Sequence, residues 1–173
     1  GILLRAAPAA FASPANPLTI PSCPTARRIM REIVFDTETT GLDPKAGDRI
    51  VEIGAIELYN HIPTGRSFHR YLNPERPVPS AAVLIHGLED AFLRAKPVFA
   101  AIADELMEFF GDANLIAHNA SFDVAFLNAE FARLGRGTLG DDRIIDTLML
   151  ARRKHPGSPA SLESAAGRPL GLH

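Results

Sequence analysis

The pattern of hydrophobic and polar positions predicts three strands in the first half of the chain. Arg31–Asp36, Ile50–Leu58 and Ser67–Leu72 each contain β-branched or aromatic residues, and turn-forming residues separate them. Consecutive strands with such short links are typical of an antiparallel meander. We therefore expect these three segments to pair in the order in which they occur.

The second half of the chain alternates between helical and strand patterns. Apolar residues recur at helical spacing over 99–110, and again after Ser121, a typical N-cap residue. Asn114–His118 and Arg143–Asp146 are typical of short buried strands, and a last helix is expected through Arg152. The order of elements predicts an α/β fold, with a mixed sheet and helices on its faces.

The two ends of the chain lack this periodicity. Residues 1–29 hold five of the 14 prolines and none of the 20 acidic residues. Proline at this density opposes a regular helix, so we interpret 1–29 as a disordered or upstream extension and 30–173 as the domain. A short helix is expected from Leu162, but Gly167 and Pro169 stop it, which suggests that the domain is incomplete at its C-terminal end.

Composition excludes several classes of protein. No apolar run approaches the ~20 residues that a membrane-spanning helix needs. The chain has 18 basic and 20 acidic residues, so a protein that holds nucleic acid by charge alone is unlikely on these numbers. Cys23 is the single cysteine, which excludes an internal disulfide framework and a cysteine-rich zinc site and fits a cytoplasmic location.

Three acidic residues stand where a ligand site is expected. Asp36 and Glu38 are two residues apart at the end of the first strand, so they share one face. Asp123 falls in the first turn of the helix near Ser121, and it joins them if the first and fourth strands are neighbours. Taken singly, each acid has a structural explanation: the end of a strand, a surface position, or a favourable helix dipole.

Together, the three carboxylates favour a metal site. Unpaired carboxylates in one cleft repel each other strongly, and a divalent cation relieves that repulsion. Mg²⁺ prefers hard oxygen ligands, and two such ions about 4 Å apart activate a water and stabilise the leaving oxygen of a phosphodiester. The pattern therefore predicts metal-dependent hydrolysis, although an Asp-x-Glu pair alone is common.

The segments around these acids resemble the motifs of the DEDDh exonucleases of the ribonuclease H-like superfamily. Within that superfamily, these segments resemble those of the epsilon subunits of bacterial DNA polymerase III. The segments that carry this resemblance are Ile33–Leu42, Arg49–Ala55, Asn60–Gly65, Ile85–Leu88, His118–Leu127 and Ala151–Gly157. The similarity extends from about Met30 to Leu162, which is most of the chain.

The resemblance implies a fold, an activity and a set of site residues. It implies a ribonuclease H-like sheet and a 3′–5′ exonuclease that releases nucleoside 5′-monophosphates from DNA during proofreading. It implies two divalent cations, Mg²⁺ or Mn²⁺, held by Asp36, Glu38 and Asp123, with Asp36 bridging both ions. The substrate contacts that it implies are those of Asp36, Thr37, Glu38, Thr39 and His86. The implied partners are a single-stranded or frayed DNA 3′ end, the catalytic (alpha) subunit of the polymerase and a small theta-like subunit.

One part of the family pattern is not found in the sequence. The third motif pairs a general-base histidine with an aspartate five residues later, but no aspartate follows Asp146. We therefore expect the chain as given to be catalytically impaired. His118 is interpreted as a structural histidine ahead of a metal ligand, Asp146 as a supporting acid, and His69 as a surface residue.

Two alternatives to the proofreading exonuclease remain. One is an exonuclease of the same superfamily that trims RNA or short oligonucleotides. The other is a catalytically impaired fragment that keeps the fold and docks to a partner. The three clustered acids oppose the second alternative, because nothing structural requires them.

Overall fold

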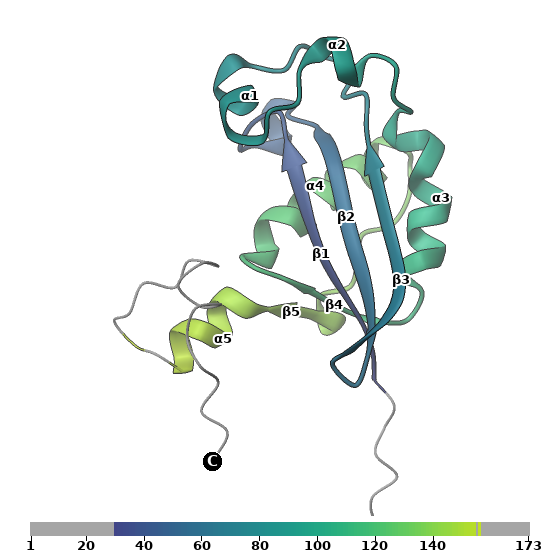
Figure 1. Cartoon of the computed structure of the whole chain (residues 1–173), viewed down its shortest axis with the longest axis vertical. Coiled ribbons are helices and arrows are strands. Elements are labelled where there is room, and N and C mark those ends of the chain that lie inside the picture. Colours follow the sequence, from purple (N-terminus) through teal and green to yellow (C-terminus); the bar gives the residue numbers. More distant parts are fainter. Residues whose placement is uncertain (1–29, 155, 157–173) are drawn as a thin grey trace, which may run out of the picture.

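The computed structural model describes residues 30–154 and 156, which fold around one mixed sheet (Figure 1). The predicted extension over 1–29 and the helix expected from Leu162 lie outside the described residues. None of the helices in the described part of the chain has the length and apolarity needed to cross a membrane.

The sheet has five strands in the order β3-β2-β1-β4-β5. The strands are β1 (Arg31–Thr39), β2 (Ile50–Tyr59), β3 (Ile62–Tyr71), β4 (Asn114–Ala117) and β5 (Ile144–Asp146). Antiparallel pairing joins β1 to β2 and β2 to β3, whereas β4 runs parallel to β1 and β5 runs parallel to β4. The predicted meander and the predicted adjacency of the first and fourth strands are both confirmed.

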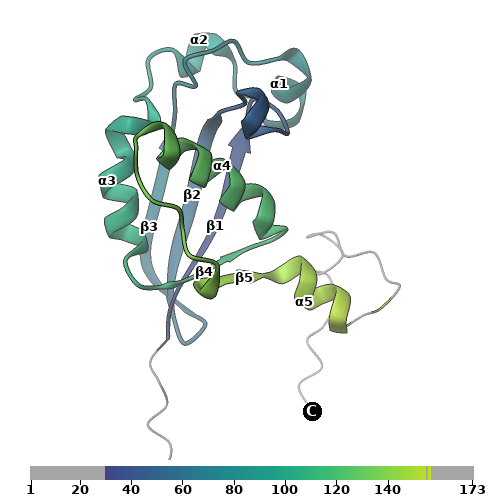
Figure 2. The same ribbon diagram turned by 180° about the vertical axis from the view of Figure 1, so that it is seen from behind.

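Two long helices cover one face of this sheet, as Figures 1 and 2 show from opposite sides. They are α3 (Phe99–Phe110) and α4 (Ala120–Arg133), and α5 (Thr147–Lys154) follows β5. Four short elements were not predicted from the sequence: α1 (Ser80–His86), α2 (Asp90–Leu93) and the 3₁₀ turns Pro44–Ala46 and Asp141–Arg143. At seven and four residues, α1 and α2 are too short for a helical period to be recognised.

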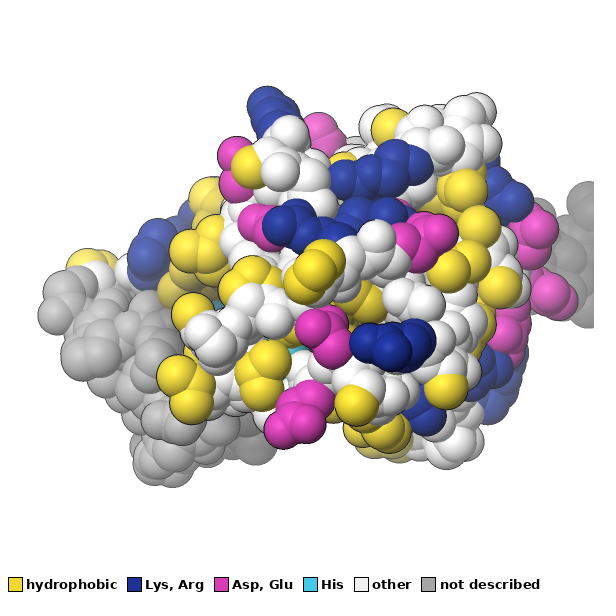
Figure 3. Space-filling view, turned by 90° about the horizontal axis from the view of Figure 1, so that it is seen from above, with side chains coloured by type: hydrophobic (Ala, Val, Ile, Leu, Met, Phe, Trp, Pro, Cys, Tyr) yellow, Lys and Arg dark blue, Asp and Glu magenta, His cyan; other side chains and the backbone are white. Residues whose placement is uncertain are grey.

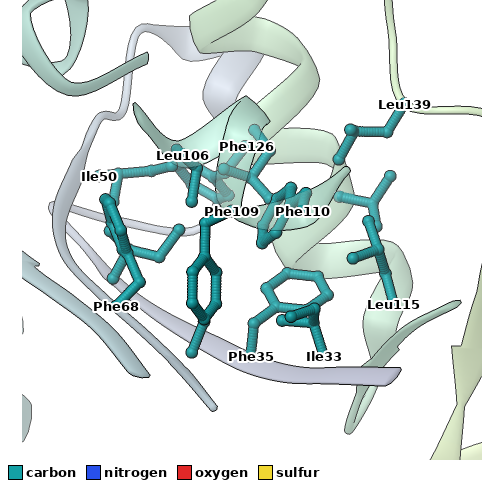
Figure 4. Packing of buried hydrophobic residues seen from close by; sticks show 14 of the residues in the cluster. Ile33, Phe35, Ile50, Phe68, Leu106, Phe109, Phe110, Leu115, Phe126 and Leu139 are labelled. Atoms are coloured by element: carbon teal, nitrogen blue, oxygen red, sulfur yellow. The ribbon is translucent and has the colours of Figure 1, made fainter. Parts of the chain in front are cut away.

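The main core lies between the sheet and helices α3 and α4 (Figure 4). Ile33 and Phe35 of β1 point into it, and the Phe35 ring lies 5.6 Å from that of Phe110. Because side chains alternate along a strand, neither Asp36 nor Glu38 shares that face with Phe35. Both point to the opposite face of the sheet. Neighbouring residues of β1 therefore serve different purposes: Phe35 packs in the core, and Asp36 faces the opposite side of the sheet.

A buried ion pair attaches the end of α3 to the sheet. Arg31 Nε donates to Glu57 Oε1 at 2.7 Å, and its two terminal nitrogens donate to the carbonyl oxygens of Phe109 and Phe110. Those carbonyls belong to the last turn of α3, where the helix itself supplies no donors. Burial alone would raise the pKa of Glu57, but the hydrogen bonds from Arg31 and Thr64 lower it below its usual value.

The start of α4 differs from the prediction. The expected N-cap, Ser121, is wrong: the cap is Asn119, and its side chain makes no capping hydrogen bond. Asn119 instead adopts a left-handed backbone conformation, with φ 64° and ψ 47°, which asparagine tolerates better than most residues. Asp123 still falls in the first turn of the helix, as the sequence predicted.

Candidate metal centre

The best-defined feature of the site is the contact between α4 and β1. Asp123 is 2% exposed, and its Oδ1 accepts hydrogen bonds from the Thr37 backbone nitrogen at 3.0 Å and from Thr37 Oγ1 at 2.6 Å. Thr37 stands between Asp36 and Glu38 in the strand. Residues 86 positions apart in the sequence are thereby joined, and the third acid is fixed against the strand that carries the other two.

Asp123 resists ionisation in this setting. Burial raises its pKa to about 6, the hydrogen bonds from Thr37 oppose that rise, and the negative charge of Asp36 adds to it. At neutral pH the ionised form of Asp123 therefore lowers the stability of the fold. A nearby positive charge would reduce this free-energy cost.

Asp36 and Glu38 show the same tendency. Burial is the main cause that raises the pKa of each, and the charge of Asp36 contributes to the rise at Glu38. Glu52 raises the pKa of both groups, whereas His118 lowers that of Asp36 and His86 lowers that of Glu38. The predicted carboxylates therefore form one electrostatically coupled group with excess negative charge.

The donor set suits a hard divalent cation, but it does not form a closed ligand cage. Carboxylate oxygens are what Mg²⁺ and Mn²⁺ prefer. Among residues 30–154 and 156, however, no three His, Cys, Asp or Glu side chains are arranged to hold an ion. The chemistry of the three acids thus fits the predicted cations, and their role as metal ligands stays a prediction.

Asp36 faces open space and not packed protein. A cavity of about 620 Å³ adjoins it on the face of the sheet opposite the core. His69, His118 and Thr147 supply polar groups to the lining, and most of the rest is apolar. A substrate can therefore reach the carboxylate from this side.

His86 carries a hydrogen-bond donor that has no partner among the described residues. Its Nδ1 accepts from the Leu88 backbone nitrogen at 3.0 Å, so a neutral ring must carry its proton on Nε2. That Nε2 is buried and makes no hydrogen bond in the described part of the chain. The predicted substrate contact by His86 stays a prediction, and this nitrogen is the atom available for it.

Thr37 and Thr39 use their hydroxyl groups within the protein. Thr37 Oγ1 donates to Asp123, and Thr39 Oγ1 donates to the carbonyl oxygen of Gly41 at 2.6 Å. Both side chains are buried. Their contacts to substrate stay predictions. Within the protein, their hydrogen bonds fix the conformation at the end of β1.

His118 and Asp146 connect β4, β5 and α5. His118 Nδ1 lies 3.1 Å from Thr147 Oγ1, and Asp146 Oδ1 accepts from the backbone nitrogens of Asn119 and Leu148 at 3.0 and 2.8 Å. These contacts fit the structural interpretation of His118. They also show that one oxygen of Asp146 is occupied in holding the start of α5.

Glu52 joins the site although its sequence context gave no sign of a role there. In the sheet, Glu52 pairs with Glu38 across β1 and β2, so their side chains share one face. His69 Nε2 lies 2.6 Å from Glu52 Oε1. The alternation of side chains tells which residues of β2 share a face with Glu52. That Glu52 lies opposite Glu38 follows only from the register in which β1 and β2 pair.

Several arginines at this end of the molecule are paired with acids. Figure 3 looks onto this end and shows Lys and Arg side chains next to acidic ones. Arg49 contacts Glu130 at 2.6 Å and Glu75 at 3.4 Å, and Arg76 contacts Asp48 at 2.9 Å. These ion pairs reduce the attraction of this surface for a polyanion.

Comparison with known proteins identifies the family. The RNase_T family model, described as exonuclease, matches residues 33–169. The chain belongs to this exonuclease family. Solved exonuclease structures share the fold of this chain. Exonuclease I matches it with a TM-score of 0.65 at 24% identity, over 72% of this chain and 29% of the exonuclease I chain. Exonuclease X in complex with 5′ overhanging duplex DNA has a TM-score of 0.59 at 28% identity over 82% of this chain and 79% of its own.

Curated relatives narrow the comparison within the exonuclease family. The chain is 52% identical to the DNA polymerase III subunit epsilon of Rickettsia felis over 142 residues, which are 80% of this chain and 62% of that protein. It is 42% identical to the protein of the same name from Escherichia coli K12, over 81% of this chain and 60% of that protein. The chain thus spans about three fifths of the length of these relatives.

Proposed function

We propose that this chain is the exonuclease domain of a DNA polymerase III proofreading subunit, which releases nucleoside 5′-monophosphates from DNA 3′ ends. The observation that carries the proposal is the contact of Asp123 with Thr37, which fixes an acid from α4 against β1, the strand that carries Asp36 and Glu38. The names of the relatives, DNA polymerase III subunit epsilon, support the same function. Residues 30–173 form the domain in this proposal, residues 1–29 precede it, and the protein works in the cytoplasm.

Asp36, Glu38 and Asp123 would hold two divalent cations, Mg²⁺ or Mn²⁺. When bound, such a pair supplies an activated water and stabilises the leaving oxygen of a phosphodiester. Within the protein, Thr37 keeps Asp123 oriented by two hydrogen bonds. His86 Nε2–H would donate a hydrogen bond to an oxygen of the terminal nucleotide.

A frayed or single-stranded 3′ end is the expected substrate for a physical reason. A mispaired end has already lost its pairing and much of its stacking, so drawing it into the site costs less free energy. We also propose the catalytic (alpha) subunit of the polymerase and a small theta-like subunit as partners, because the relatives are named as subunits of that polymerase.

The general base is the part of the mechanism that the 173 residues do not supply. No histidine followed by an aspartate five residues later occurs after Asp146. General-base catalysis contributes about 10²- to 10⁴-fold to a rate. We therefore expect the 173-residue chain to be slower by that factor than a chain extended through such a segment.

The test is degradation of a 5′-labelled DNA single strand by the 173-residue chain and by the extended chain, with Mg²⁺ and with Mn²⁺. Asp123→Asn should abolish shortening from the 3′ end, whereas Asp104→Asn, at an exposed acid paired with Arg136, should not. Equal rates for the wild type and Asp123→Asn would refute the proposal. Faster degradation of an RNA strand would favour the RNA-trimming alternative, and no turnover by the extended chain would favour the partner-docking alternative.

A further inference from the structure

The open face of the sheet continues from the candidate metal centre towards an aromatic group. Glu38, Glu52 and Tyr71 are successive partners across β1, β2 and β3, so they form one row on this face. His69 lies in the next row, opposite Gly54, and contacts Glu52 at 2.6 Å. The His69 ring meets the Tyr71 ring edge-on, with centroids 4.8 Å apart. The row thus leads from the carboxylates to Tyr71.

Beyond Tyr71 the row ends in a second ring and a lysine. The rings of Tyr71 and Phe92 lie 5.0 Å apart at an interplanar angle of 79°. Lys96 Nζ lies 4.0 Å from the centre of the Phe92 ring and 5.9 Å from that of Tyr71. We call Tyr71, Phe92 and Lys96 the aromatic platform.

The aromatic platform is anchored on one side and accessible on the other. Tyr71 packs against a second, small cluster of buried residues, which comprises Val51, Val78, Ala82 and Leu93. Phe92, on the short helix α2, is 43% exposed. Within the described residues Lys96 has no carboxylate partner, whereas Arg49 and Arg76 are both paired with acids. Its charge is therefore available to an external anion.

We propose that the aromatic platform binds a nucleotide of single-stranded DNA next to the one held at the candidate metal centre. This inference rests on the proposed function. Proteins that bind single strands combine aromatic rings, on which bases stack, with basic side chains that contact the phosphates. The platform offers both groups, and it lies about two strand spacings, or about 10 Å, from Glu38 along the row. It therefore serves a nucleotide other than the one being cleaved.

The platform also accounts for how an acidic protein could hold a polyanion. Stacking does not depend on net charge, because every base presents a π-face. Lys96, whose Nζ lies over the Phe92 ring, supplies a positive charge for one phosphate. Binding of this kind should be less sensitive to salt than binding by a basic surface, since few counterions are released.

Tyrosine fluorescence reports on the platform directly. The chain contains two tyrosines and no tryptophan, so Tyr59→Phe leaves Tyr71 as its one tyrosine. Oligothymidylate titrated into this variant in EDTA, where no hydrolysis occurs, should quench the Tyr71 emission. Tyr71→Phe, which keeps Tyr59 at the far end of β2, should show no quenching.

Two further variants test affinity. In the Tyr59→Phe background, Phe92→Leu and Lys96→Gln should each weaken binding on the order of tenfold, and Lys154→Gln on α5 should not. The unfolding midpoint of each variant shows whether it is folded. Absence of quenching, or unchanged affinity in both folded variants, would overturn the platform.

A small substrate separates this inference from the proposed function. A nitrophenyl ester of thymidine 5′-monophosphate is too short to reach the platform, so Phe92→Leu and Lys96→Gln should hydrolyse it at the wild-type rate in the extended chain. If the extended chain without substitutions did not hydrolyse this ester, the exonuclease proposal would be refuted. Intact hydrolysis with unchanged oligonucleotide affinity would refute the platform alone.

Discussion

Asp123 and Thr37 are joined by two hydrogen bonds to the same carboxylate oxygen, 3.0 Å from the Thr37 backbone nitrogen and 2.6 Å from its hydroxyl. The backbone bond depends on the position of β1, and the hydroxyl bond depends on the side chain. Strand and helix are therefore held together at Thr37, the residue between Asp36 and Glu38.

Thr37→Val tests the hydroxyl bond with little change in shape. We expect it to lower the free energy of unfolding by about 1–3 kcal/mol, because a buried carboxylate loses a partner. It should also reduce metal-dependent hydrolysis of single-stranded DNA, since Asp123 is less firmly oriented. Thr37→Ser retains the hydroxyl and should keep most of both properties, as urea denaturation and a gel assay would measure. If Thr37→Val matched the wild type in both, the bond would have no such role.

The raised pKa of Asp123 predicts a pH dependence of stability without metal. Its pKa is about 6 in the folded chain against 3.8 ordinarily, so the folded state holds the proton more tightly. The stability from this group is therefore greatest below about pH 4 and is lost as the pH rises through 6. Relative to Asp123→Asn, the wild type should lose about 2 kcal/mol between pH 4.5 and pH 7.5.

This pH effect is measured by urea denaturation in EDTA, with both proteins at both pH values. Comparison with Asp123→Asn removes the contributions of other groups, such as Glu57, whose pKa is lowered. Mg²⁺ should stabilise the wild type at pH 7.5 more than it stabilises Asp123→Asn. A constant difference between the two proteins across the pH range would contradict the assignment.

Arg49 and Glu130 form a buried pair that should be important for stability. Glu130 is 2% exposed, and Arg49 donates to both of its oxygens, at 2.6 and 3.0 Å. Arg49→Met leaves that carboxylate without its main partner, so we expect a loss of about 3–5 kcal/mol. Arg136→Met breaks an exposed pair with Asp104 and should change the unfolding midpoint little. Similar midpoints for the two variants would contradict the distinction.

His86 should act through its Nε2 proton. His86→Phe keeps a ring but removes the donor, and the loss of one hydrogen bond to a charged oxygen should lower kcat/KM about 10- to 100-fold in the extended chain. The NMR nitrogen shifts of the ring should show Nε2 protonated at neutral pH. A ring protonated on Nδ1 instead would rule out the bond from Leu88 and with it this role.

The sequence predicted the elements whose periodicity is long enough to recognise. β1, β2 and α3 follow their hydrophobic patterns, and Asp36 and Glu38 share a face because they are two residues apart in β1. β3 begins at Ile62, before the predicted start at Ser67, and its exposed first residues carry no such pattern. Helices α1 and α2 span only one or two turns and left no such pattern. The cap of α4 was misplaced because Asn119 caps through its backbone conformation and not through its side chain.

Residues that join the site through strand pairing were not predictable in the same way. Glu52 lies opposite Glu38 only because β1 and β2 pair in that register, and Tyr71 follows because β2 and β3 pair in theirs. The contact of Thr37 with Asp123 likewise depends on the packing of α4 against β1. Spacing within one segment indicates a shared face, whereas contacts between segments need the fold.

The most direct test of the metal centre is a calorimetric titration of the 173-residue chain with Mn²⁺. We predict saturable binding by the wild type, at least tenfold weaker binding by Asp123→Asn, and wild-type binding by Asp104→Asn. Wild-type affinity and stoichiometry in Asp123→Asn would contradict the claim that Asp36, Glu38 and Asp123 act together to hold the cations.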